Sequence, residues 1–269
     1  MTGGRFDTDA GALGRRIDAH GRYAERPLEP WLLGLLDPAF GAACLELGCG
    51  TGKQTIPLAA AVGESGSVLA VDVSAEALAE LADRARAAGP VAPINILRAD
   101  FDELAAAGCK RRFDRVVSSY ALYYSRAPEA LISAIGGAIA PGGILCACGP
   151  GKGNNDELLR FLATLGAEPA VSGPIELMEE VAPDLIEDSV GPVERHRLEN
   201  PLRFGSAAAL HSYWSSHNSF DPALDGAFRS AAEQHFRCEA EFVTTKRVLA
   251  LRARAPGERE DAGGKGREV

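Results

Sequence analysis

Between residues 42 and 148, short apolar runs alternate with segments in which apolar side chains recur every three to four positions. Such short runs, bounded by glycine, asparagine or aspartate, are typical of buried strands, and the longer periodic segments are typical of amphipathic helices. Strands that alternate with helices predict an α/β protein with a mostly parallel sheet. The predicted strands are 42–47, 67–73, 94–101, 113–119 and 144–148, with a helix over Ala75–Ala88.

The segments on either side of this region have a different pattern. Apolar residues recur at helical spacing from Leu28 to Leu35, which predicts one or two helices between about 10 and 36. The later predicted elements are helices near 156–166, 175–186 and 206–215 and extended chain near 193–198 and 241–251. The expected units are a helical N-terminal cap (1–37), a main domain (38–254) with a cap insertion at about 150–215, and a disordered tail (255–269) rich in Pro, Gly and charge.

Composition limits the classes of partner. The 269 residues are 46% hydrophobic and 24% charged, which is enough apolar material for a sizeable core. The net charge of −9 argues against a non-specific nucleic-acid binder. No apolar run approaches the roughly 20 residues of a membrane span, and the N-terminus lacks an apolar signal core. The six cysteines include no C-x-x-C pair, which favours a reducing cytoplasm.

Three alternate glycines, Gly48, Gly50 and Gly52, follow the first predicted strand and precede a helix. Glycine allows positive φ and close approach of a ligand, and N–H groups at a helix start can bind the ligand's polar atoms. A dinucleotide fingerprint would need glycine where this chain has Lys53, and Glu46 would repel a pyrophosphate but suits a cation. The alternative interpretation is a tight strand-to-helix turn.

This stretch resembles the first motif of class I S-adenosylmethionine (SAM) methyltransferases, whose ligand carries a sulfonium and an ammonium group and no phosphate. The Pro-Gly-Gly-x-Leu sequence at 141–145 is similar to the family's turn before strand five. The resemblance covers about residues 38–150 and, more weakly, 190–254. It implies a Rossmann-like, doubly wound, mostly parallel seven-stranded sheet with an antiparallel last strand. It also implies SAM as the cofactor and S-adenosylhomocysteine as the product.

Acids at the ends of the next two predicted strands extend the resemblance. Asp72 lies 20 residues after Gly52, a spacing at which one carboxylate can hold both ribose hydroxyls, or it caps the helix that follows. In the family, an acid at the position of Asp100 accepts from the adenine amino group, and its neighbour, here Phe101, packs on the ring. Asp100 could instead cap the short segment 102–107.

Two further cofactor contacts are expected. Tyr23 lies where many family members place a cofactor-contacting tyrosine, and packing on an amphipathic helix is an equal alternative. The fourth predicted strand ends at Ser118-Ser119, and in the family this strand end faces the transferred methyl group. Ser118 is therefore a candidate cofactor contact.

Candidate groups for the methyl acceptor follow the same strand. Tyr120, Tyr123 and Tyr124 share a face if Tyr120 begins a helical turn, so that Tyr123 or Tyr124 can orient the acceptor. His211 is the preferred proton acceptor if one is required, because histidine is a residue type suited to proton transfer near neutral pH. For each of these residues a packing or surface role is the commoner alternative. No cluster of metal ligands is visible, so we expect no metal.

Three classes of function fit these motifs. The first is methyl transfer by in-line displacement to a small molecule, in a closed pocket formed by residues 10–36, the Tyr120–Tyr124 loop and the 150–215 insertion. The chain has 23 arginines and only 5 lysines, which indicates a G+C-rich bacterial gene. Specialised metabolism is the expected context of the small-molecule reaction. The second is methylation of a protein or RNA, and the third is SAM binding for another reaction. We expect no nucleic-acid or membrane partner, and a homodimer stays open.

Overall fold

One seven-stranded sheet organises the computed structural model, which describes residues 22–89, 91–108, 111–168, 173–217 and 219–257. The strands are β1 (Ala43–Leu47), β2 (Ser67–Asp72), β3 (Ile94–Arg98), β4 (Phe113–Ser119), β5 (Ile139–Pro150), β6 (Val193–Phe204) and β7 (Phe242–Arg254). They lie in the order β3-β2-β1-β4-β5-β7-β6. The first five are parallel, and β7 is antiparallel to both β5 and β6. The expected Rossmann-like sheet with an antiparallel last strand is confirmed.

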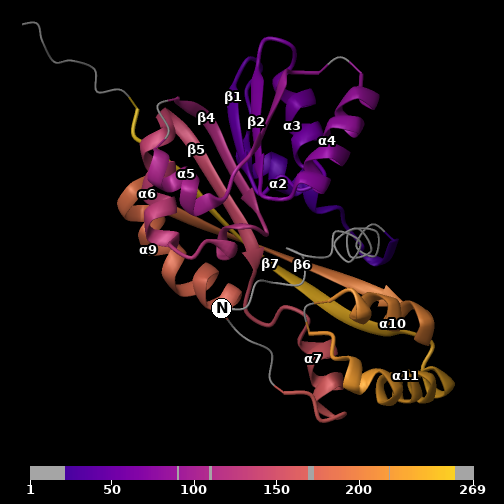
Figure 1. The fold of residues 1–269 in the computed structure, drawn as a ribbon. Helices are drawn as coiled ribbons and strands as arrows, with labels where there is room; N and C mark the ends of the chain where they lie inside the picture. Colours follow the sequence, from indigo (N-terminus) through magenta and orange to yellow (C-terminus); the bar gives the residue numbers. More distant parts are fainter. Residues whose placement is uncertain (1–21, 90, 109–110, 169–172, 218, 258–269) are drawn as a thin grey trace, which may run out of the picture.

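Helices cover both faces of this sheet, as Figure 1 shows. One face carries α2 (Leu28–Leu36), α3 (Thr55–Val62) and α4 (Ala75–Ala87), and the other carries α5 (Phe101–Ala107), α6 (Pro128–Ala138) and α9 (Ala182–Ser189). Successive strand side chains point to opposite faces, so neighbouring residues enter different cores. Cys44 belongs to the same cluster as Leu32 of α2, whereas Leu45 belongs to that of Leu131 of α6. No helix among the described residues is long and apolar enough to cross a membrane.

The last two strands run on past the rest of the sheet. β5 pairs with β7 only as far as Pro150 and Val248, whereas β6 and β7 stay paired from Glu199–Arg247 to Phe204–Phe242. The two strands therefore project as a ribbon beyond the carboxyl end of β5 (Figure 1). At its far end lie α7 (Asp156–Ala163), α10 (Ala207–Ser215) and α11 (Asp225–Cys238). We call ribbon residues 199–204 and 242–247, with these three helices, the distal lobe.

The distal lobe has an apolar core of its own. Trp214 stacks on Phe228 with 4.1 Å between ring centroids, which joins α10 to α11. Tyr213 packs on Phe204 of the ribbon with 5.1 Å between centroids. The buried members of this core are Leu158, Leu162, Leu202, Phe204, Leu210, Tyr213, Trp214, Phe228, Ala232 and Phe242. Because the lobe has its own apolar core, its three helices are held to the ribbon beyond the carboxyl edge of the sheet.

The chain segment ahead of α2 pairs with the ribbon. Ala24 forms an antiparallel bridge with Leu202. The side chain of Asn200 accepts a hydrogen bond from the backbone N–H of Arg26 at 3.1 Å and donates one to the carbonyl of Arg26 at 2.6 Å. These contacts attach the segment ahead of α2 to the distal lobe. A cap formed by the N-terminal segment would therefore start from this attachment.

Parts of the expected cap insertion (150–215) lie elsewhere. α9 packs against α6 on the sheet, and residues 193–198 of β6 pair with β7 inside it, so both belong to the main domain. The lobe in turn continues past 215 because α11 packs on α10. The first 21 residues of the expected N-terminal cap and residues 258–269 of the expected tail lie outside the described residues. The remaining short elements are η2 (Leu122–Tyr124), α8 (Gly173–Glu176), η3 (Leu177–Val181) and η4 (Pro222–Leu224).

Candidate functional site

The three alternate glycines have different roles in the loop after β1. All three take positive φ, at 74° for Gly48, 50° for Gly50 and 85° for Gly52. A Cβ on Gly48 would overlap the Cβ of Ala121, and one on Gly52 would overlap the Leu81 side chain. A Cβ on Gly50 would meet nothing within 4 Å. The outer glycines are therefore needed for packing, whereas the middle one leaves open space at the carboxyl edge of the sheet.

Asp72, at the end of β2, holds this loop in place. Its Oδ2 accepts a hydrogen bond from the backbone N–H of Gly50 at 2.8 Å, and its Oδ1 accepts one from Ser74 at 2.9 Å. The N-cap of α4 is Ser74, whose Oγ accepts from the backbone N–H of Ala77. Capping is thus supplied by Ser74. Each carboxylate oxygen of Asp72 keeps a further acceptor site for a ribose hydroxyl, and that contact stays a prediction.

Glu46 is a buried carboxyl beneath the glycine loop. It is 2% exposed and accepts a hydrogen bond from Thr55 Oγ1 at 2.6 Å. Burial raises the pKa of Glu46 from 4.5 to about 8; the Thr55 hydrogen bond opposes this rise and the charge of Asp72 adds to it. Such a carboxyl ionises readily only beside a cation, which is what a sulfonium or ammonium group would supply.

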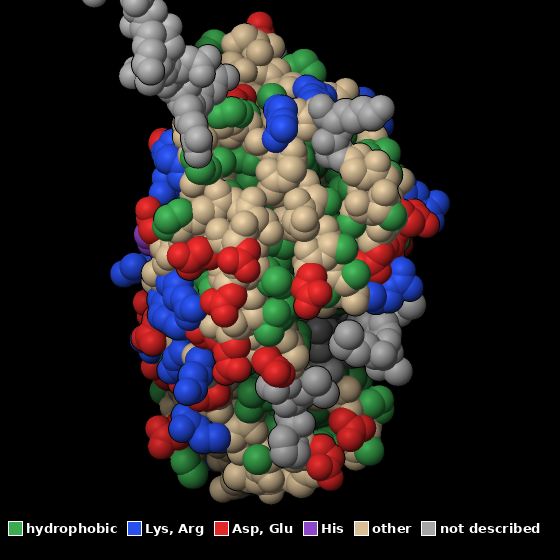
Figure 2. Space-filling model, turned by 90° about the vertical axis from the view of Figure 1, so that its left-hand side faces the viewer, with side chains coloured by type: hydrophobic (Ala, Val, Ile, Leu, Met, Phe, Trp, Pro, Cys, Tyr) green, Lys and Arg blue, Asp and Glu red, His purple; other side chains and the backbone are tan. Residues whose placement is uncertain are grey.

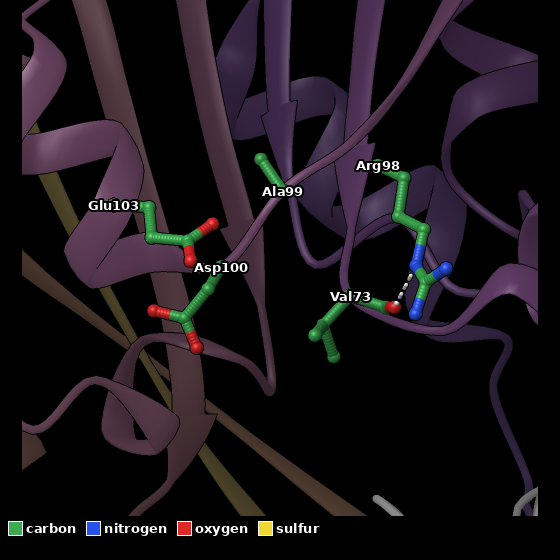
Figure 3. A pocket seen from close by; sticks show the side chains of 5 residues that line it. All are labelled: Val73, Arg98, Ala99, Asp100 and Glu103. Carbon is green, nitrogen blue, oxygen red and sulfur yellow. Dashed lines mark hydrogen bonds between the residues drawn. The ribbon is translucent and has the colours of Figure 1, made fainter.

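Asp100 caps α5, which is the alternative that the sequence left open. Its Oδ1 accepts from the backbone N–H of Asp102 at 2.8 Å. It also borders an open hollow of about 390 Å³ lined by Val73, Arg98, Ala99, Asp100 and Glu103. Figure 3 shows the carboxylates of Asp100 and Glu103 on one side and the Arg98 guanidinium, bonded to the Val73 carbonyl at 3.1 Å, on the other. The adenine contact stays a prediction, and the hollow supplies space for it.

Phe101 and Ser118 flank the start of the glycine loop. Phe101 Cζ would lie 3.4 Å from a Cβ on Gly48, so its ring reaches over the loop. Ser118 is paired in register with Leu47, next to Gly48. Its Oγ is buried and has no hydrogen-bond partner among the described residues. Because a buried hydroxyl without a partner is costly, a polar ligand atom at this point fits the site.

Tyr23 packs on the distal lobe. Its ring lies 4.8 Å from that of Phe204, tilted by 46°, and it belongs to the fringe of the lobe core. This is the packing role that the sequence weighed equally with a cofactor contact. The cofactor contact of Tyr23 stays a prediction.

Tyr120, Tyr123 and Tyr124 do not share one face, because the helical turn at Tyr120 on which that arrangement depended is not formed. Tyr120 has φ of 56°, so it does not begin a helical turn, and the 3-10 turn covers Leu122–Tyr124 instead. Tyr120 joins the cluster on the α2 face. Tyr123 lies on the other face, because its Cε1 would be 3.5 Å from a Cβ on Gly149. The left-handed residue reverses the chain between them. Tyr123 and Tyr124 pack together at 4.9 Å, and their roles toward an acceptor stay predictions.

His211 lies inside the distal lobe. Its Nε2 is 2.6 Å from Asp225 Oδ1, and its ring makes edge contacts with Trp214 and Phe228. These three partners belong to α10 and α11, and none is on a strand end of the sheet. The structure therefore gives His211 a role in joining two helices, and proton transfer by His211 stays a prediction.

The sequence analysis passed over two buried or half-buried polar groups. His217 Nε2 lies 3.2 Å from the Asn155 side chain, which also accepts from the hydroxyl of Tyr213 at 3.2 Å. Lys246 is only 9% exposed, and its Nζ lies 4.2 Å from the centroid of the Tyr120 ring. A signal for Lys246 was present, because its strand alternates and puts it on the same face as the core residue Val248. His217 gave no such signal.

The described residues fit a cationic ligand that carries hydroxyl groups. The site offers an open middle glycine, carboxylates at three neighbouring strand ends and a hydroxyl in need of a partner. Within the described parts of the chain, no three His, Cys, Asp or Glu side chains gather closely enough to hold a metal ion. The expectation of no metal stays a prediction.

Comparison with known families matches residues 44–143 to the model of a methyltransferase domain. No curated protein sequence matches the chain. A candidate methyltransferase from Bacillus halodurans C-125 is similar in structure, with TM-score 0.60, 15% identity, and coverage of 84% of this chain and 98% of that one. The [4+2]-cyclase SpnF has TM-score 0.57, 18% identity and coverage of 94% of both chains.

A third similar structure is phosphoethanolamine N-methyltransferase 2 of Haemonchus contortus, in complex with phosphomonomethylethanolamine and S-adenosylhomocysteine. Its TM-score is 0.57 at 16% identity, and the match covers 94% of this chain and 58% of that one. At these identities the three structures show a shared fold. That fold serves a protein named as a cyclase as well as a protein named as a methyltransferase, so the substrate has to be argued from this chain's own residues.

Proposed function

This chain carries a class I SAM-dependent methyltransferase domain, and on that premise we propose that it methylates a small molecule in a closed pocket at the carboxyl edge of the sheet. The observation that carries the proposal is the distal lobe. It extends beyond the ends of β4 and β5 and is tied to the N-terminal segment through Asn200. A lobe beside this edge supplies one wall for a ligand that has to be shielded from water.

We assign the cofactor contacts to groups around the glycine loop. Glu46 and Ser118 would hold the amino-acid end, Asp72 the ribose, and Asp100 with Phe101 the adenine. Gly50 would let the ligand approach the backbone. When bound, SAM supplies an electrophilic methyl group on a positively charged sulfur. The chain's part is to bind it, to align the acceptor behind the methyl carbon and to exclude water, and alignment of this kind is worth roughly 7–11 kcal/mol.

Charge supports a small acceptor over RNA. The net charge is −9, whereas a protein that grips a phosphate backbone needs a basic surface. On the face shown in Figure 2, acidic and basic side chains are intermixed, with acids across the middle. Many arginines among the described residues are paired with carboxylates; Arg197, for example, binds both oxygens of Glu179 at 2.7 and 2.6 Å. We extend the proposal to specialised metabolism in a bacterial cytoplasm. The five described cysteines are free thiols, which suits a reducing compartment.

A second candidate is SAM binding without methyl transfer. The structural similarity to a [4+2]-cyclase over 94% of both chains favours this candidate, since it shows that nearly the whole fold also occurs in a protein named for a different reaction. Both candidates use the same cofactor contacts, and they differ in what happens to SAM.

One experiment separates the two. The protein is incubated with SAM labelled in its methyl group and with small-molecule extracts, and products are read by mass spectrometry. Methyl transfer predicts a labelled product and an equal amount of S-adenosylhomocysteine. A product with unchanged mass, formed while SAM persists, supports the second candidate and contradicts the first.

A further inference from the structure

A buried lysine lies at the carboxyl end of β4. Lys246 is on β7, two residues beyond Val248, the last residue that β5 pairs with, so it lies where β7 has passed the end of β5 and pairs with β6 alone. It is 9% exposed, and its Nζ lies 4.2 Å from the ring centroid of Tyr120, the residue directly after β4. A buried ammonium group has to be compensated by its surroundings, and an aromatic face supplies part of that.

The ring under this lysine is fixed by the backbone. Tyr120 has φ of 56°, which is unfavourable for a bulky side chain, and its N–H donates to the Cys148 carbonyl at 2.8 Å. Strained residues persist where the surrounding structure holds them, and they gather at functional sites. The strain here sets the ring direction at the strand end closest to the proposed transfer. Tyr120 therefore presents a ring held by its backbone to the Lys246 ammonium group.

The two ends of the carboxyl edge differ in charge. Glu46, Asp72 and Asp100 follow or lie on β1 to β3, where the cofactor contacts are assigned. Lys246 lies beside β4 and β5, where the acceptor has to enter. A cation in a water-poor site attracts an anion strongly. At the cofactor end the cations are Arg98, which borders the same hollow as two carboxylates, and Lys53, which is paired with Glu29. Carboxylates therefore outnumber unpaired cations at that end, whereas Lys246 places a cation at the other.

We propose that Lys246 binds an oxyanion of the methyl acceptor, so that the acceptor is a small organic carboxylate; this rests on the proposed methyl transfer. A carboxylate that is itself the nucleophile uses an oxygen lone pair to form the new C–O bond. The electron pair of the breaking C–S bond stays on sulfur, so an anion and a sulfonium become a neutral ester and a neutral thioether. No proton moves, and no general base is required.

Binding is the first test, with the protein saturated with S-adenosylhomocysteine. Calorimetry compares 4-hydroxybenzoate, indole-3-acetate and octanoate with their methyl esters, for wild type, Lys246→Met, Lys246→Arg and the exposed-cation control Arg86→Met on α4. We expect at least one carboxylate to bind wild type about tenfold more tightly than its ester. Lys246→Met should remove this preference, Lys246→Arg should keep most of it, and Arg86→Met should behave as wild type.

The inference is wrong if no carboxylate binds better than its ester, or if Lys246→Met keeps the preference. It is also wrong if Lys246→Met and Lys246→Arg lose S-adenosylhomocysteine binding or stability equally, because Lys246 is then a structural residue.

Turnover measurements distinguish failure of this inference about Lys246 from failure of the proposed methyl transfer. Methylation of neutral acceptors with unchanged kcat/KM in Lys246→Met would overturn the inference and leave methyl transfer standing. Charge-dependent carboxylate binding with no methyl transfer to any small molecule would overturn the proposed function and leave Lys246 as an anion-binding residue. Raised KM with unchanged kcat in Lys246→Met, for a carboxylate acceptor only, is the expected result.

Discussion

The glycine-loop region and the distal lobe use polar groups in opposite ways. Around the loop, the carboxylates of Asp72 and Asp100 accept hydrogen bonds from backbone N–H groups and can still accept further ones. The Ser118 hydroxyl has no hydrogen-bond partner among the described residues. In the lobe, His211 is bonded to Asp225, and Asn155 is bonded to Tyr213 and His217. The first region is therefore arranged for a ligand, whereas most polar groups of the second hold helices and the ribbon together.

The largest expected effect is on stability and SAM affinity when two glycines of the loop are replaced, because one is needed for packing and the other for ligand approach. Gly48→Ala should cost about 2–5 kcal/mol of stability, because its Cβ overlaps Ala121 and its φ is positive. Gly50→Ala should cost only about 1–2 kcal/mol, from its φ alone, while it abolishes tight SAM binding. Denaturant unfolding and SAM titration of both variants check this. Normal SAM affinity in a folded Gly50→Ala protein would mean that no ligand approaches there.

The next effect is a pH dependence at Glu46. The pKa of Glu46 is higher in the folded chain, about 8, than its ordinary 4.5, so the folded chain binds more protons between these values. Stability of the unliganded protein should therefore fall as pH rises from about 4.5 to about 8, and Glu46→Gln should remove that fall. A cationic ligand favours the ionised form, so SAM affinity should rise with pH toward 8, by up to about tenfold per unit.

Calorimetry across this pH range, with Glu46→Gln as the matched control for titration of SAM itself, measures the affinity. Identical pH profiles in wild type and Glu46→Gln would remove Glu46 from cofactor binding.

A smaller effect, on SAM affinity in one case and on stability in the other, distinguishes Asp72 from Ser74. Asp72→Ala should weaken SAM by about 1–3 kcal/mol, because a ribose hydroxyl loses its acceptor. Ser74→Ala should lower stability by about 1 kcal/mol through loss of the α4 cap and leave SAM affinity unchanged. Calorimetric titration and thermal unfolding of the pair check both. Equal SAM affinities in wild type and Asp72→Ala would confine Asp72 to its role in holding Gly50.

The smallest effect is expected in the lobe. His211→Ala should lower stability by about 1–2 kcal/mol, since a hydrogen bond between α10 and α11 and two ring contacts are lost. The pH–rate profile should keep its shape, because these contacts are remote from the strand ends. A flattened acidic limb with unchanged stability would instead establish His211 as the general base.

The sequence predicted the sheet because its strands are short apolar runs, and the resemblance added the number of strands and the antiparallel last strand. The glycines, Glu46 and Asp72 could be singled out as candidates because the strand, turn and helix around them lie close together in the chain; their cofactor contacts stay predictions. The distal lobe was not recognised as one unit, because its helices lie on both sides of β6 in sequence and meet only through contacts such as Phe161 of α7 with Phe228 of α11.

The acceptor side was harder to predict for two physical reasons. The left-handed φ of Tyr120 is a single backbone angle that helical spacing does not reveal, and it sends Tyr120 and Tyr123 to opposite faces. The approach of Lys246 to Tyr120 joins residues 126 positions apart, so it depends on how β7 lies beside β5. His217 likewise meets Asn155 only after the lobe folds.

Calorimetric titration of the full chain with SAM and, separately, with NAD tests the account most directly, because both ligands carry adenosine and only SAM lacks phosphate and carries a sulfonium. The account predicts a SAM dissociation constant on the order of micromolar, near −8 kcal/mol, and no binding of NAD. Binding of NAD without binding of SAM would contradict it.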